Sequence, residues 1–225
     1  MLLYHGTAAE NVVGILKDGI RPRGRRQGNW QHTIRSNPSC VYLTSAYAGY
    51  FALCASESGR IGILEVNTDR LDQNNLLPDE DFLEQANRSY DGNKHGRTMK
   101  MRTEWYRKHA RQYQPHWKLS VEKMGTCCYK GMVSPSAITR ATTFDGEGRA
   151  DILMAVADPT ITILNYRFCG TRYRAITRWL VGYDIDVEKE ILDDGYQALH
   201  WFPDYQKQLQ ATFGNKTGLT ILRGG

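Results

Sequence analysis

The sequence predicts an α+β fold in which short strands form a sheet and helices pack against it. Short apolar segments rich in β-branched and aromatic residues alternate along the chain with segments of helical periodicity. Hydrophobic residues make up 41% of the 225 residues, enough for a sizeable buried core. The expected strands cover residues 2–5, 41–44, 60–67, 126–129 and 138–144.

Helices are predicted where apolar residues recur at helical spacing. Residues 9–18 form the first, and Gly19 follows where a helix cap is expected. Ser45 is expected to cap the second helix, which runs to about Ala55. Further helical segments are predicted over residues 98–113 and, after Pro115, through Glu122. Residues 21–39 are predicted to be loop, and residues 72–96 are polar, with no helix or strand assigned to them.

The acidic, glycine-containing segment 145–148 is the predicted boundary between two units. Residues 1–145 would form the core. Residues 146–225 would form a C-terminal α/β appendage that binds substrate or a partner.

Several protein classes are not expected. No apolar run approaches the length of a membrane span, and the N-terminus lacks the features of a secretory signal. Five cysteines without framework spacing indicate reduced thiols and a cytoplasmic protein. Without a CxxC pair or an HExxH motif, no metal site is expected.

The net charge of +5 is concentrated in three basic clusters. Aromatic residues interleave with the bases in two of them, which suits a polyanion because phosphates pair with Arg and bases stack on rings. A solvated basic surface with buried aromatics is the alternative. The clusters are Arg21, Arg23, Arg25 and Arg26; nine Lys and Arg within 94–123; and Arg167, Arg172, Arg174 and Arg178.

The first fifty residues suggest a pocket for a dinucleotide. Gly6, at a strand end, lets a ligand approach the backbone, and the His5 imidazole can hydrogen-bond a ribose hydroxyl. Tyr42, on the next strand, offers a flat face for an aromatic ring. Alternatively, His5 is a satisfied strand-edge residue and Tyr42 belongs to the core.

The segments YHGT, ILKDGI and VYLTSAYAGYFA resemble the His–Tyr–Glu branch of the ADP-ribosyltransferase superfamily. The resemblance is clear over residues 3–52 and fainter over 60–71 and 126–144. It implies a split β-sheet core and NAD as a substrate. The residues implied in binding NAD are His5 on the ribose; Gly6 and Thr7 of the first motif; Tyr42 as the signature tyrosine; Thr44 or Ser45 near the carboxamide; and Tyr47 or Tyr50 stacked on the nicotinamide.

Two nucleic-acid-directed branches are most similar. Residues 130–135 resemble a turn of the tRNA 2′-phosphotransferases, although those enzymes have an additional N-terminal lobe. Arg35 stands before the second strand as an arginine does in DarT-type toxins, which ADP-ribosylate DNA bases.

The family's glutamate is missing from residues 126–132, where it is expected. The nearest upstream acids are Glu122 and Glu104, and residues 79–81 could fold back over the pocket. Either another acid serves, with Glu122 the leading candidate beside His5, Tyr42 and Arg35, or Arg35 itself positions the phosphates, or the site is inactive.

The leading hypothesis is therefore an NAD-dependent ADP-ribosyltransferase that modifies DNA or RNA, as a toxin or phage-defence effector. The alternatives are an RNA 2′-phosphotransferase and an inactive nucleic-acid-binding module. An antitoxin could bind the acidic residues 184–194. The residues expected to hold nucleic acid are Arg23, Arg25, Arg26, Arg172, Arg174 and Arg178.

Overall fold

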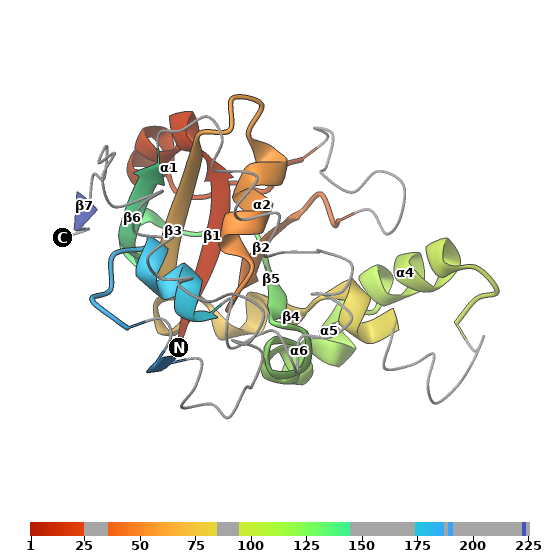
Figure 1. Ribbon diagram of the computed structural model, residues 1–225. Helices are drawn as coiled ribbons and strands as arrows, with labels where there is room; N and C mark the ends of the chain where they lie inside the picture. The colour runs from red at the N-terminus through yellow and green to blue at the C-terminus, as the bar shows by residue number, and fades with distance from the viewer. Residues whose placement is uncertain (25–35, 85–94, 145–173, 187–188, 191–221, 224–225) are drawn as a thin grey trace.

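The computed structural model describes residues 1–24, 36–84, 95–144, 174–186, 189–190 and 222–223, and it confirms the α+β class. A seven-stranded sheet runs through the molecule in the order β4-β5-β2-β1-β3-β6-β7 (Figure 1). Every neighbouring pair is antiparallel. The strands are β1 Leu2–Ala8, β2 Cys40–Thr44, β3 Ile61–Asn67, β4 Leu76–Pro78, β5 Thr126–Lys130, β6 Ile138–Phe144 and β7 Leu222–Arg223.

The sheet divides into two halves between β1 and β2. These strands share one residue pair, Tyr4 with Thr44. By contrast, β1 pairs with β3 along its whole length, and β2 pairs with β5 along its whole length. The edge of β1 beyond Tyr4 therefore has no ladder partner in β2, and a strand edge of this kind presents backbone donors and acceptors.

The first two helices follow β1 and β2. Helix α1 (Val12–Asp18) starts after a 3₁₀ turn and ends at Gly19, whose φ of 89° favours glycine. Helix α2 (Ala48–Ala55) begins later than expected, and the predicted Ser45 cap is wrong. Instead, the buried Thr44 hydroxyl accepts hydrogen bonds from the amides of Ala46 and Tyr47, because the chain turns directly after β2.

The segment predicted as one helix over 98–113 is two helices. Thr98 caps α4 (Met99–Lys108), and α5 (Ala110–Tyr113) follows a break at His109, where ψ is 19°. A 3₁₀ turn then leads into α6 (Trp117–Met124). Helix α4 projects away from the sheet on the side of β4 (Figure 1). Strand β4 lies inside the polar stretch 72–96, where no strand was predicted.

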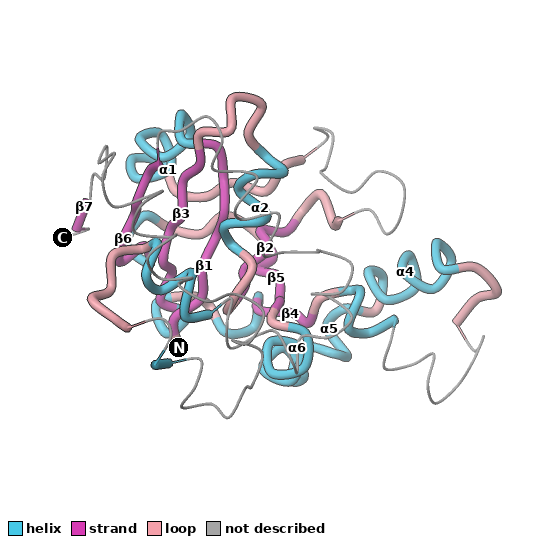
Figure 2. The backbone as a smooth tube through the Cα atoms, in the orientation of Figure 1, coloured by secondary structure: helices cyan, strands magenta, loops and turns pink. Residues whose placement is uncertain are grey.

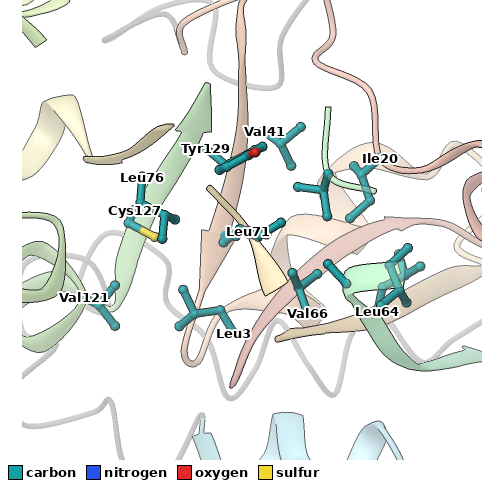
Figure 3. Close-up of a cluster of buried hydrophobic side chains, with 14 of the residues drawn as sticks. Leu3, Ile20, Val41, Leu64, Val66, Leu71, Leu76, Val121, Cys127 and Tyr129 are labelled. Atoms are coloured by element: carbon teal, nitrogen blue, oxygen red, sulfur yellow. The ribbon is translucent and has the colours of Figure 1, made fainter. Parts of the chain in front are cut away.

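Hydrophobic side chains pack on both faces of the sheet. One cluster joins Leu3, Val41, Leu64 and Val66 to Val121 of α6 and is drawn in Figure 3. On the opposite face, Tyr4 and Ile63 pack with α2 and with a helical segment at 174–180. Figure 2 shows helices and loops on both sides of the strands.

The described part of the predicted C-terminal unit packs onto the core. The Thr177 hydroxyl donates to the Ala46 carbonyl, and Tyr183 donates to Glu65 of β3 at 2.7 Å. Strand β7 extends the sheet beside β6. The division at residue 145 stays a prediction, because 145–173 lie outside the described residues.

Two further properties concern the described part of the chain. None of its helices is long and apolar enough to cross a membrane. Its cysteines (Cys40, Cys54, Cys127 and Cys128) are free thiols.

Candidate active site

His5 lies where β1 and β2 separate. Its Nδ1 is 3.0 Å from the Tyr42 carbonyl oxygen. A carbonyl only accepts, so Nδ1 must carry the proton in this contact. Burial lowers the pKa of His5, which favours the neutral ring at pH 7. Nε2 of that neutral tautomer is an acceptor, suited to a hydroxyl donor such as a ribose.

The Tyr42 side chain joins β2 to a buried carboxylate. Its hydroxyl donates to Glu80 Oε2 at 2.5 Å and accepts from the Asn37 amide at 2.6 Å. Burial and the neighbouring Glu80 charge hold the pKa of Tyr42 well above its usual value. The hydroxyl therefore stays protonated and continues to donate to Glu80 at neutral pH.

Glu80 reaches this position because it follows the short strand β4. Leu77 of β4 pairs with Cys128 of β5, and Cys128 pairs with Tyr42 of β2. The Ser120 hydroxyl of α6 accepts from the Asp79 amide at 3.0 Å, which fixes the chain just past the strand. The acid thus follows β4, the strand that pairs with β5, and does not come from β5 itself or from the residues directly before β5.

Arg107 of α4 contacts Glu80 from the other side. Its Nε donates to Glu80 Oε1 at 3.1 Å. Its Nη2 is buried and, among the described residues, has no hydrogen-bond partner. A buried guanidinium nitrogen beside a cavity suits an anionic or acceptor group. The small cavity here is lined by Arg107, Glu80, Asn37, Leu77, Pro78, Leu83, Tyr106, Ala110 and Cys128.

The acids on either side of Glu80 are strongly perturbed. Burial, followed by the Glu80 charge, raises the pKa of Asp79 to about 6. Burial, followed by the charges of Asp79 and Glu80, raises the pKa of Asp81 to about 8, although Arg107 opposes this shift. Carboxylates crowded in this way disfavour each other's ionisation, and perturbed groups of this kind concentrate at functional sites.

The first motif is packed tightly against α2. A Cβ added to Gly6 would lie 1.9 Å from the Ala48 carbonyl oxygen, so glycine is needed for α2 to approach β1. The buried Thr7 hydroxyl accepts from the Asn11 amide group at 3.2 Å. On the face of the sheet that α2 covers, it is therefore the backbone of α2, and not a ligand, that approaches Gly6 closely.

The residues expected near the carboxamide and the nicotinamide mostly make contacts within the protein at the start of α2. The Thr44 hydroxyl donates to the Gly125 carbonyl at 2.8 Å besides accepting from two amides. The half-buried Ser45 hydroxyl lies 3.5 Å from the same carbonyl. Tyr47 is buried in the core, whereas Tyr50 is half-buried against Phe51, with ring centroids 5.7 Å apart. Tyr50 is thus the more accessible ring.

The structure does not bring Glu122 into this group. Its exposed side chain on α6 forms an ion pair with the adjacent Lys123 at 2.7 Å. The acid that meets Tyr42 is Glu80. The apolar Leu76-Leu77-Pro78 before the acidic run was the sequence signal for a strand there, but the surrounding polar residues obscured it. Arg35 lies outside the described residues.

The predicted nucleic-acid-binding arginines have different environments. Arg23 donates to Ser36 through Nε, 3.0 Å from the hydroxyl, and through Nη2, 2.6 Å from the carbonyl. Arg178 forms an ion pair with Glu190 at 2.6 Å and lies over the Tyr183 ring, so it is engaged within the protein. Arg174 is exposed, and Arg25, Arg26 and Arg172 lie outside the described residues.

The described residues contain no group of three or more His, Cys, Asp or Glu side chains placed to hold a metal ion. Comparison with known proteins adds no family assignment, because no family model and no curated protein matches the sequence significantly.

Proposed function

We propose that this protein is an NAD-dependent ADP-ribosyltransferase that modifies nucleic acid, with an ADP-ribosyltransferase-like fold. The observation that carries the proposal is the chain of contacts from His5 through Tyr42 to Glu80. It supplies a histidine, a tyrosine and a glutamate, the signature of the family that the sequence resembles. The glutamate comes from a part of the chain that the resemblance did not indicate.

The residues where β1 and β2 separate support NAD as the substrate. His5 Nε2 would accept from a ribose hydroxyl, and the β1 edge beyond Tyr4 offers backbone groups to a carboxamide. Tyr50, half-buried near the start of α2, is the accessible ring on which the nicotinamide would stack. Arg107 Nη2, which has no hydrogen-bond partner among the described residues, suits an oxygen of the acceptor or of a phosphate.

Bound NAD would supply the ADP-ribosyl group, as the C1′–nicotinamide bond breaks, nicotinamide leaves with the bonding electrons and an acceptor atom bonds to C1′. Glu80 places a buried negative charge at the site, and a preorganised charge stabilises positive charge that develops during a reaction. Tyr42 and Arg107 hold both oxygens of that carboxylate. The proton that the acceptor atom loses would pass to water.

The nucleic-acid acceptor is proposed from the basic clusters, whose charges suit phosphates. A role as a toxin or phage-defence effector, with an antitoxin at residues 184–194, stays a prediction that rests on the resemblance. The Tyr42–Glu80 contact supplies the missing acid, which favours an enzyme over an inactive binding module.

The test is to incubate the purified protein with NAD labelled in its ADP-ribose portion and with single-stranded DNA, double-stranded DNA or RNA. We expect label on a nucleic acid and equimolar release of nicotinamide. Label confined to protein, or no nicotinamide release with any acceptor, would contradict the proposal. Release of phosphate from 2′-phosphorylated RNA with consumption of NAD would instead identify a 2′-phosphotransferase.

A further inference from the structure

Helix α4 has two chemically different faces. On the inner face, the buried Arg102 forms a 2.5 Å ion pair with Glu84, and at the edge of this face the partly exposed Arg107 contacts Glu80. On the outer face, Lys100, Glu104 and Lys108 recur at i, i+4 and i+8 and are exposed. Arg102 and Arg107 are therefore neutralised locally, whereas the outer bases outnumber the one acid among them.

Exposed bases greatly outnumber acids on this part of the chain. Arg97, before α4, and Arg111, in α5, are also exposed. Between residues 95 and 113 of the described chain, the one acid is Glu104. An exposed set of bases with so little opposing charge attracts a polyanion.

The aromatic residues of α4 are engaged within the protein. The Trp105 ring stacks with the His95 ring, at a centroid distance of 3.7 Å, and with the His109 ring, at 4.0 Å. Tyr106 is fully buried, and Tyr113 packs edge-on against it. These rings stabilise α4 and α5, so base stacking by them is not expected.

We propose that the outer face of α4 and α5, formed by Arg97, Lys100, Lys108 and Arg111, binds the phosphate backbone of the nucleic-acid substrate. This inference rests on the proposed function for the identity of the reaction, but not for the binding itself. Contacts of this kind hold the strand without reading its bases. Binding by this face is therefore independent of base sequence and strongly dependent on salt.

The position of this face relates it to the candidate active site. Arg107 lies seven residues after Lys100, at the edge of this face, and contacts Glu80, so the bound backbone would run beside the edge of the helix that holds this carboxylate. Helix α4 would then hold the substrate with its outer face and Glu80 at the edge of that face.

The experiment measures anisotropy of fluorescent single-stranded DNA and RNA of mixed sequence, without NAD and at several salt concentrations. The variant Lys100→Glu/Lys108→Glu/Arg111→Glu is compared with Lys17→Glu/Lys130→Glu/Lys189→Glu, which changes the net charge equally at exposed positions elsewhere. We expect the first variant to bind at least about 10-fold more weakly. Its log–log salt slope should fall by roughly 2, because each phosphate neutralised on a single strand contributes about 0.7 to that slope. We expect the second variant to bind within about 2-fold of wild type.

A neutral set, Lys100→Gln/Lys108→Gln/Arg111→Gln, keeps helix-forming residues and tests the same phosphate contacts if the glutamates disturb α4. Equal weakening by both glutamate variants, or no binding by the wild type, would overturn the inference. Binding that depends on α4 and α5 in a protein that transfers no ADP-ribose would sustain this inference and refute the proposed function. If the variant Lys100→Glu/Lys108→Glu/Arg111→Glu transfers ADP-ribose with an unchanged dependence on nucleic-acid concentration, the proposed function would stand and this inference would be refuted.

Discussion

Two buried glutamates in this protein have similar first contacts and different surroundings. Glu65 on β3 accepts from the Tyr183 hydroxyl at 2.7 Å and from the Thr139 hydroxyl at 2.6 Å, with Arg140 Nε at 3.9 Å. Glu80 accepts from Tyr42 and Arg107. Both therefore combine a tyrosine hydroxyl with an arginine.

The neighbours of the two carboxylates distinguish them. Beside Glu65, Arg140 donates to the Gly182 carbonyl and lies 3.9 Å from the centre of the Tyr183 ring. Beside Glu80 there are two acids with raised pKa values, a small cavity, and Arg107 Nη2 without a hydrogen-bond partner among the described residues. A buried ion pair thus indicates a structural role when its partners are satisfied, and a candidate ligand site when some remain unsatisfied.

The strongest test of this difference is Glu80→Gln. The substitution keeps the shape of the side chain and removes its charge, so we expect ADP-ribosyl transfer to fall by about 10²-fold or more. Transfer would be measured as initial rates with saturating NAD, after circular dichroism has verified the fold. The matched control is Glu122→Gln, at the exposed acid of α6, which should retain the wild-type rate. If Glu122→Gln loses most of the transfer rate while Glu80→Gln keeps it, the catalytic acid would be Glu122 and not Glu80.

The second test concerns the structural glutamate. Glu65→Gln weakens two hydrogen bonds to a buried carboxylate, and we expect a loss of about 1.5–3 kcal/mol in the free energy of unfolding. Urea denaturation would measure it, with the exposed Glu10→Gln as a control of unchanged stability. A double-mutant cycle with Tyr183→Phe should reveal positive coupling between Glu65 and Tyr183. Additive effects in the cycle would mean that the Tyr183 contact does not fasten residues 174–186 to the sheet.

The third test concerns the pH dependence of stability when one of the crowded acids is replaced. The pKa of Asp81 in the folded protein, about 8, lies above its unfolded value, so the folded state binds the proton more tightly. That contribution to stability is present below about pH 4 and is lost as the pH rises toward 8. Asp81→Asn, which resembles the protonated acid, should match wild type near pH 4 and be more stable than wild type at pH 8 to 9.

Denaturant titrations of both proteins across this pH range would provide the measurement. The variant must be compared with wild type at each pH, because Asp79, with its pKa near 6, and Arg107 also face this group. A stability difference that is constant from pH 4 to pH 9 would contradict the proposed crowding.

Much of the fold was predictable because local patterns encode it. The strands around residues 2–5, 41–44 and 138–144 are present, although β1 extends through Ala8, since the His-Gly-Thr residues continue the ladder with β3. Strand β4 was missed because its three residues obtain their stability by pairing with β5, which lies far along the chain. The break at His109 was missed because α4 and α5 both have helical composition.

The candidate site was predictable in part for the same reason. His5 and Tyr42 stand out by their local motifs, and the structure brings them into contact. Glu80 does not stand out, because nothing in a run of acids in a polar segment indicates which carboxylate will be buried. That depends on the β4–β5 pairing, on Ser120 and on Arg107.

The sequence by itself determined the α+β class, the strand and helix patterns of the N-terminal motifs and the clustering of basic residues. These features depend on residue spacing and composition, which act within a few turns of the chain. The tertiary structure alone decided which acid meets Tyr42, which glutamate is satisfied, and which bases of α4 face solvent. Burial and long-range pairing set the environment of each charge, and neither is specified by the residues immediately around it.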